Sequence, residues 1–209
     1  IFHLSTAIET GLFRNDIPLS EKKITAEVCV HHLWFSSADY KTHGTRIKWN
    51  PAVKHQEDQD ALWTALNDDR IDVLATDHAP HTLEEKNNKY ASAPSGGPLV
   101  QHALLALLTA SKRGKISLEK LVQKACHNPA ILFDVEKRGY VRVGYFADLV
   151  LLDLNETTTV TPESLLYHCK WSPFEGETFQ AKIESTWVNG SCVYDKGVII
   201  ENKAAKRLT

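Results

Sequence analysis

The first part of the chain alternates short apolar runs with amphipathic segments. The β-branched run "ITAEVCV" (24–30) predicts a buried strand, and the shorter run over residues 71–75 predicts a second one. Between them, the segment 57–69 places Leu62 and Leu66 four positions apart with alanines alongside, which predicts a helix. Strands that alternate with helices favour a parallel sheet, either doubly wound or part of a (β/α)8 barrel.

Further helices are predicted in the middle of the chain. The stretch "HALLALLTASKRG" is strongly apolar and ends at Gly114, the residue type that most often follows a helix C-terminus. Ser117 is placed to cap the helix that comes next. Asn128 and Pro129 are typical of an N-cap and a first helical position, which predicts one more short helix. This region has too few strand signals to close a barrel by itself.

The end of the chain has a different pattern. "ADLVLLDL" (147–154) predicts a continuous apolar strand, and "TWVNGSCVY" (186–194) predicts a hairpin. Asn189 and Gly190 both tolerate positive φ, which suits a type I′ turn. The segment 195–197 predicts another turn. We therefore divide the chain into an α/β region over residues 1–136 and a small β subdomain over residues 137–209.

Composition narrows the class of protein. The chain has 209 residues, of which 43% are hydrophobic, and these support a substantial core. Its net charge of -2 argues against nucleic acid as a partner, and no apolar run reaches the ~20 residues that cross a membrane. The four cysteines form no C-x-x-C pair, which favours a reducing, cytoplasmic location. The chain lacks methionine and begins inside an apolar stretch at Ile1, so we expect it to be the C-terminal part of a longer protein.

Two strand ends carry residues that bind metals in other proteins. His3 follows the apolar start of the chain, and Asp77 follows the run over 71–75. An imidazole nitrogen and a carboxylate oxygen are ordinary Zn²⁺ ligands, and a carboxylate beside activated water can act as a general base. Pro80 keeps the preceding residue out of the helical region, so His81 is expected in a loop. A structural histidine and a turn aspartate would give the same spacing, and both interpretations stay open at this point.

Several motifs in one order carry a resemblance that favours the metal site. They are "FHLSTA" (2–7), "ITAEVCVHHLWF" (24–35), "KWNPAVK" (48–54), "ATDHAPH" (75–81) and "APSGG" (93–97). The chain resembles the C-terminal half of a dihydroorotase in the amidohydrolase superfamily. This resemblance implies the last strands and helices of a (β/α)8 TIM-like barrel, a small β-sandwich subdomain, and a site for zinc at the barrel mouth, with two ions when complete. The implied reaction is the reversible cyclisation of N-carbamoyl-L-aspartate to (S)-dihydroorotate in pyrimidine biosynthesis.

The resemblance also implies roles for individual residues. Asp77 would bind metal and shuttle the proton, and His3 would be a second metal ligand. The substrate would be held by four residues: Asn50, His81, Ser95 and Gly96. The remaining metal ligands and a carboxylate-binding arginine are expected before Ile1, in the N-terminal remainder of the barrel. Residues 1–209 alone are therefore expected to bind zinc poorly and to be inactive.

The sequence leaves two alternative functions open. A dihydropyrimidinase or allantoinase is a second enzyme candidate, although Asn50 and His81 suit a substrate that bears a carboxylate. A catalytically inactive dihydroorotase-like scaffold subunit is a third possibility, and homo-oligomerisation is left open. His31 and His32 would point to opposite faces of a strand, so a structural role is favoured over a metal pair. His78 is expected to pack, and the segment "LEEKNNKY" is expected to form a solvated loop or to cover the site.

Overall fold

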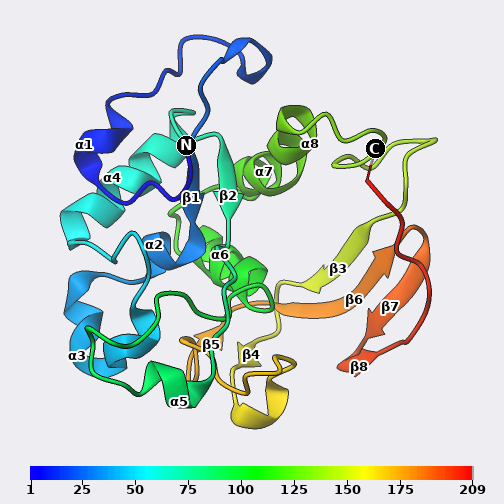
Figure 1. The fold of residues 1–209 in the computed structure, drawn as a ribbon. Coiled ribbons are helices and arrows are strands. Elements are labelled where there is room, and N and C mark those ends of the chain that lie inside the picture. Colours follow the sequence, from blue (N-terminus) through cyan, green and yellow to red (C-terminus); the bar gives the residue numbers. More distant parts are fainter. Residues whose placement is uncertain (209) are drawn as a thin grey trace.

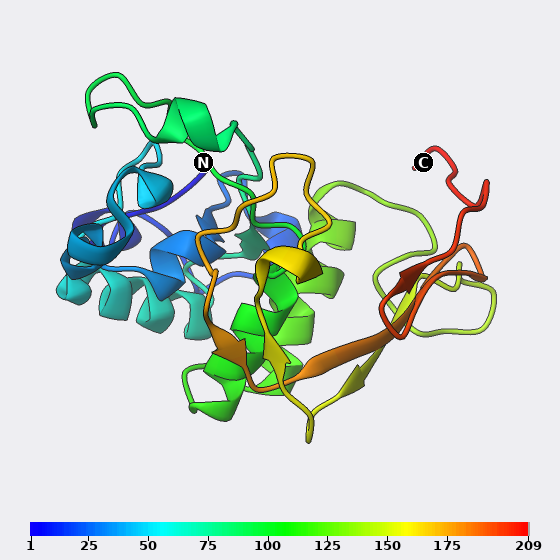
Figure 2. The same ribbon diagram turned by 90° about the horizontal axis from the view of Figure 1, so that it is seen from below.

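The structure is a computed structural model that describes residues 1–208. It combines an α/β body with an antiparallel sheet that extends to one side of it (Figures 1 and 2). The elements of the first half are α1 (Ala7–Thr10), η1 (Leu19–Glu21), β1 (Glu27–Cys29), α2 (Val30–Trp34), η2 (Ser37–Asp39), α3 (Tyr40–His43), η3 (Gly44–Ile47), α4 (Gln56–Asn67), β2 (Val73–Ala75) and α5 (Leu83–Lys86).

The second half begins with helices and ends with strands. Its elements are α6 (Ala103–Lys112), α7 (Leu118–Val122), η4 (Gln123–His127), α8 (Asn128–Leu132), β3 (Leu149–Asp153), β4 (Thr158–Thr159), η5 (Pro162–Ser164), β5 (Thr178–Phe179), β6 (Lys182–Val188), β7 (Ser191–Asp195) and β8 (Val198–Ile199). No helix within residues 1–208 is long and apolar enough to cross a membrane.

Parallel strands form the centre of the body. β1 pairs with β2 in parallel, with Glu27 opposite Val73. The first residues of the chain lie along the other edge of β1, because Leu4 N–H donates to Glu27 O (3.0 Å) and Glu27 N–H donates to Ile1 O (3.1 Å). Three extended segments therefore run in the same direction, and their carboxyl ends meet at one edge.

Both predicted strands of this region are present but short. β1 stops at Cys29, and α2 begins at Val30, so His31 and His32 lie on a helix. The expectation that these two histidines alternate across a strand was wrong. The apolar run continues through a change from strand to helix, and apolar character alone does not distinguish a buried strand from a buried helical turn.

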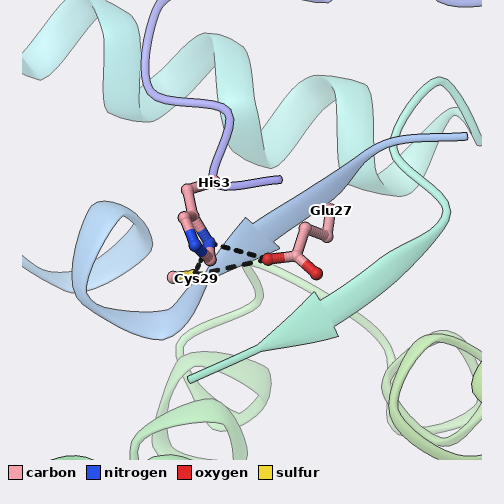
Figure 3. Close-up of side chains that lie close together, drawn as sticks. All are labelled: His3, Glu27 and Cys29. Carbon is pink, nitrogen blue, oxygen red and sulfur yellow. Dashed lines mark hydrogen bonds and ion pairs between the residues drawn. The ribbon is translucent and has the colours of Figure 1, made fainter. Parts of the chain in front are cut away.

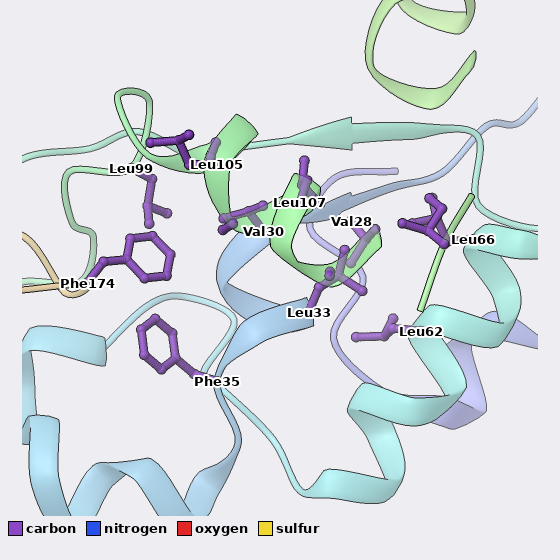
Figure 4. Packing of buried hydrophobic residues seen from close by; sticks show 14 of the residues in the cluster. Val28, Val30, Leu33, Phe35, Leu62, Leu66, Leu99, Leu105, Leu107 and Phe174 are labelled. Carbon is purple, nitrogen blue, oxygen red and sulfur yellow. The ribbon is translucent and has the colours of Figure 1, made fainter. Parts of the chain in front are cut away.

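The core lies between the parallel strands and the helices α4 and α6 (Figure 4). Val28 of β1 is fully buried, as are Leu62 and Leu66 of α4. Leu105 and Leu107 of α6 join the same cluster. Burial of each such side chain stabilises the fold by roughly 1.5–3 kcal/mol. The predicted helices over 57–69 and 102–114 are confirmed, and their apolar faces are what hold the strands in place.

The ends of α6 and α7 follow the predicted signals. Gly114 has φ 75°, and its N–H donates to Ser111 O (2.9 Å) while Lys115 N–H donates to Ala110 O (3.0 Å), a pattern typical of a glycine-terminated helix. Ser117 Oγ accepts from Lys120 N–H (3.1 Å), so Ser117 is an N-cap as predicted.

The N-cap predicted at Asn128 was wrong. The helix of α7 continues through the π-helical turn η4 into α8, and Asn128 has helical φ and ψ. Its side-chain amide donates to Asp72 O (2.6 Å) and is buried. Asn128 therefore connects α8 to the segment that leads into β2. This role could not be predicted from the local sequence, because Asp72 is distant in sequence.

The end of the chain forms the predicted hairpins. β3, β6, β7 and β8 make one antiparallel sheet in that order. Asn189 (φ 51°) and Gly190 (φ 81°) form the turn between β6 and β7, as predicted for a type I′ turn. Lys196 and Gly197 also have positive φ between β7 and β8. Leu149 to Leu151 of β3 are exposed within the part of the chain that the structure describes, so the second layer of a sandwich stays a prediction.

Part of the predicted subdomain packs into the main core. Val160, Phe174 and Phe179 are buried in the same cluster as α4 and α6. Gln180 N–H donates to Thr109 Oγ1 on α6 (2.9 Å). The segment that contains β4 and β5 is therefore anchored to the α/β body, whereas the division at residues 136 and 137 stays a prediction.

Candidate metal centre

His3 and Asp77 come together at the carboxyl ends of the two extended segments that lie on either side of β1. Their backbones have positive φ, 57° at His3 and 47° at Asp77, a region in which histidine and aspartate are enriched among non-glycine residues. His3 Nε2 lies 3.6 Å from Asp77 Oδ1, and each side chain is 26% exposed. The structure thus brings together the two predicted metal ligands, and both side chains are partly exposed.

Glu27 of β1 holds the other side of the His3 ring (Figure 3). Its Oε1 lies 2.7 Å from His3 Nδ1, and its side chain is only 12% exposed. A carboxylate in this position accepts a hydrogen bond from Nδ1–H and leaves the Nε2 lone pair free, which is how metal-ligating histidines are usually oriented. Sequence reasoning missed Glu27, although an acid inside the apolar run "ITAEVCV" was a visible signal.

Cys29 completes the cluster around His3. Its Sγ lies 3.1 Å from His3 Nδ1, and it is on the same face of β1 as Glu27 because the two residues are two positions apart. Burial, followed by the nearby charges of Glu27 and Asp77, raises the pKa of the Cys29 thiol well above its usual range. The thiol is therefore a neutral neighbour, and the Glu27 carboxylate is the hydrogen-bond acceptor for His3 Nδ1.

The donor set fits a zinc ion. Two ligands at about 2.1 Å from one tetrahedral Zn²⁺ lie roughly 3.4 Å apart, close to the 3.6 Å between His3 Nε2 and Asp77 Oδ1. That separation exceeds a good hydrogen bond, so the two groups are not hydrogen-bonded to each other. His3 and Asp77 could supply two ligands, and Glu27 the carboxylate that orients His3.

Asn50 and His81 are two of the predicted substrate-binding residues. In sequence, Asn50 precedes Asp77 and His81 follows it. Asn50 is exposed and precedes Pro51. Pro51 O lies 3.0 Å from His32 Nε2, so this histidine anchors the loop of Asn50. The His81 side chain is partly exposed, and its backbone oxygen accepts from Trp171 Nε1 (2.8 Å). Both predicted substrate residues are thus on fixed backbone with accessible side chains.

The loop of Ser95 and Gly96 packs against the strand-end segment of Asp77. Gly96 has φ 114°, and a Cβ there would lie 2.6 Å from Ala79 O, so no other residue fits without movement. Ala79 N–H donates to Gly97 O (3.3 Å), and Gly96 N–H donates to Lys48 O (2.9 Å). The loop is therefore attached both to the segment of Asp77 and to the segment of Asn50.

The remaining histidines of the region have structural contacts. His31 is fully buried and stacks on Trp49 with ring centroids 4.2 Å apart. Burial, followed by the charges of nearby histidines, lowers the pKa of His31 well below its usual range, so its ring is neutral. His78 Nδ1 accepts from Leu99 N–H (3.1 Å) and Val100 N–H (3.3 Å), which anchors the start of the segment before α6.

Comparison with known proteins identifies the family. The model of the amidohydrolase family matches residues 7–193, most of the chain. The chain belongs to the amidohydrolase family. It is 41% identical to a dihydroorotase from Halobacterium salinarum over 82% of this chain and 40% of that protein. A dihydroorotase from Clostridium acetobutylicum is 35% identical over 93% of this chain and 46% of its own length.

Solved structures of amidohydrolase-type enzymes have the same fold. The L-hydantoinase (dihydropyrimidinase) from Arthrobacter aurescens superimposes with a TM-score of 0.87 at 29% identity, over 96% of this chain and 45% of that one. The chain therefore spans less than half the length of these relatives. The parallel strands, helices and antiparallel sheet described above are the part of the family fold that this chain contains.

Proposed function

We propose that this chain forms the C-terminal part of a zinc-dependent dihydroorotase. The observation that carries the proposal is the pairing of His3 Nε2 with Asp77 Oδ1 at 3.6 Å, with Glu27 behind the ring of His3. The similarity to dihydroorotases over most of the chain supports the substrate. In this proposal residues 1–4, β1 and β2 are the last strands of a (β/α)8 barrel, and β3 and β6–β8 contribute to a β-sandwich.

Each site residue has a distinct part in the reaction. Bound zinc, in a complete site of two ions, would polarise the amide carbonyl and lower the pKa of water toward neutrality. The Asp77 carboxylate takes up the proton released by the attacking water and returns it to the leaving ring nitrogen. Glu27 fixes the ring of His3, so that its Nε2 stays directed at the same point as Asp77.

Three further groups orient the anionic substrate. The His81 imidazole and the Asn50 amide face solvent near the strand ends and would donate to the substrate carboxylate. The backbone of Ser95 would hold the ring from the loop that packs on Ala79. Gly96, whose N–H and oxygen bond Lys48 and Lys86, would set the conformation of that loop. Exact placement matters, because a displacement of the reacting groups by about 1 Å can lower the rate ~100-fold.

Turnover by the full-length protein that contains this chain tests the proposal. We expect hydrolysis of dihydroorotate to exceed that of dihydrouracil and allantoin, and the Asp77→Asn variant to lose at least ~100-fold in kcat because the proton carrier is gone. Asp195→Asn, which removes an acid from β7 far along the chain, serves as the control. Preference for dihydrouracil would favour the dihydropyrimidinase type, and no turnover with zinc bound would favour the scaffold.

The isolated chain gives a second test. Residues 1–209 provide only the His3 and Asp77 part of the proposed ligand set, so we expect weak zinc binding and no dihydroorotate turnover. Equilibrium dialysis against zinc and a turnover assay on the isolated chain would measure both. Activity comparable to that of the full-length protein would contradict the proposed division of the site.

A further inference from the structure

Lys86 is a fully buried lysine at the end of α5. Within residues 1–208 its ammonium group donates to backbone oxygens and lies over the Trp171 ring, 5.8 Å from the ring centroid. Its Nζ donates to Gly96 O (2.7 Å), Pro94 O (2.9 Å) and Lys48 O (3.3 Å). An ammonium has three N–H groups, and here three backbone oxygens receive them. Burial, followed by the charge of Lys48, lowers the pKa of Lys86 to about 8.

A buried lysine without a carboxylate partner is unfavourable for folding, since desolvation of the ammonium is offset here only by carbonyl dipoles and the face of the Trp171 ring. The positions of the three carbonyls in the sequence show which segments this arrangement holds together. Lys48 lies two positions before Asn50, Pro94 and Gly96 flank Ser95, and Lys86 itself follows His81 by five positions. Lys86 thus joins the three segments that carry the proposed substrate-binding residues.

Other contacts hold the same loop at its far end. Lys48 Nζ donates to Tyr90 O (2.6 Å) and Ala93 O (2.6 Å). Thr45 Oγ1 donates to the backbone oxygen of Lys86. The segment 83–97 is therefore fastened by side chains that bind its backbone, and the predicted solvated loop is held at defined points.

We propose that Lys86 is a positioning residue, whose ammonium sets the conformation of the Pro94–Gly97 loop and thereby its fit to the substrate. The claim about substrate fit rests on the proposed function, whereas the claim about loop conformation does not. Loop order can be measured without any substrate, whereas substrate fit requires turnover. Lys86 does not contact the reacting atoms in this arrangement, so its loss should act on binding more than on the chemical step.

Amide hydrogen exchange of the full-length protein tests loop order. In the wild type, we expect the Gly96 amide, which donates to Lys48 O, to exchange at least ~10-fold more slowly than the amides of residues 88–91. In Lys86→Met, Gly96 should exchange at least ~10-fold faster than in the wild type, because the loop shifts to hydrate the freed carbonyls. Lys89→Met is the matched control: the same substitution at an exposed position of the same loop.

Kinetics with dihydroorotate test the claim about substrate fit. We expect Lys86→Met to raise KM about 10-fold or more while kcat changes less than about 3-fold, and Lys89→Met to change neither. Fast exchange of Gly96 in the wild type would overturn the proposal without use of a variant, even if Lys86→Met fails to fold. Faster exchange of the Gly96 amide in Lys86→Met with an unchanged KM would overturn the positioning role. Faster exchange of that amide, in a protein whose wild type does not turn over dihydroorotate, would support the role of Lys86 in the loop and contradict the proposed function instead.

Discussion

At the scale of single residues, the two nitrogens of the His3 ring have different surroundings. Nδ1 is held by Glu27 at 2.7 Å, and Nε2 faces Asp77 at 3.6 Å. The first contact decides the tautomer, and the tautomer decides which nitrogen can bind a metal. Glu27 is therefore expected to influence the metal without touching it.

Replacing Glu27 tests this dependence. In the full-length protein, Glu27→Gln keeps the size of the side chain but removes its charge, so we expect zinc affinity to fall about 10- to 100-fold. Competition titration with a chelating dye measures the affinity directly. Glu184→Gln, the same change at an ion-paired glutamate on β6, should leave the affinity unaltered. Equal affinities in the two variants would contradict the role of Glu27.

At the scale of elements, local sequence signals worked where the element is decided by its own residues. Ser117, Gly114 and Asn189 sit where capping and turn chemistry placed them. The local signals failed at two places. At Asn128 a contact distant in sequence decides the role of the side chain, and in the run 24–30 the strand changes to a helix. The same limit explains Glu27, whose partner His3 is brought to it by the strand pairing.

The role of Asn128 leads to a test that distinguishes the two interpretations. An N-cap asparagine is replaced well by aspartate. In the structure, Asn128 instead donates to Asp72 O, and aspartate would place an acceptor against an acceptor. We expect Asn128→Asp and Asn128→Ala each to lower the free energy of unfolding by about 1–3 kcal/mol, measured by urea denaturation of the full-length protein. Wild-type stability in Asn128→Asp would restore the N-cap interpretation.

At the scale of the whole molecule, the alternation of strands and helices predicted an α/β body, and the motifs predicted the family. Residues 1–4 were predicted as a strand end from two apolar residues, which give no periodicity, and the motif supported that prediction. The contact of residues 158–181 with α6 was not predicted, since it depends on how Phe174 and Phe179 meet a helix far away in sequence. The site could be predicted as a set of ligands, whereas its supporting contacts required the fold.

Buried histidines give the molecule a predicted response to acid. His102 is almost fully buried beside Ser172 and Tyr167, and burial lowers its pKa to about 4. Between pH 6.5 and 4 the unfolded chain binds more protons at this residue than the folded one, so stability falls as the pH falls. The contribution of His102 is at most about 3.5 kcal/mol, from ~1.4 kcal/mol per pKa unit.

Urea denaturation at several pH values measures this response. His102→Gln should lower stability near neutral pH but flatten its decline between pH 6.5 and 4. His168→Gln, at an exposed histidine, is the control and should keep the wild-type slope. An unchanged slope in His102→Gln would show that the decline comes from other groups.

The positive φ of both His3 and Asp77 restricts how this centre can change during evolution. Besides glycine, the residues most enriched in left-handed backbone are asparagine, aspartate and histidine. Substitution by cysteine or glutamate at either position would add backbone strain of order 1 kcal/mol. The backbone conformation at these two positions therefore favours aspartate and histidine, an oxygen and a nitrogen donor, before any ion binds. It disfavours cysteine, whose thiolate would give the site a preference for softer metals such as Cu(I).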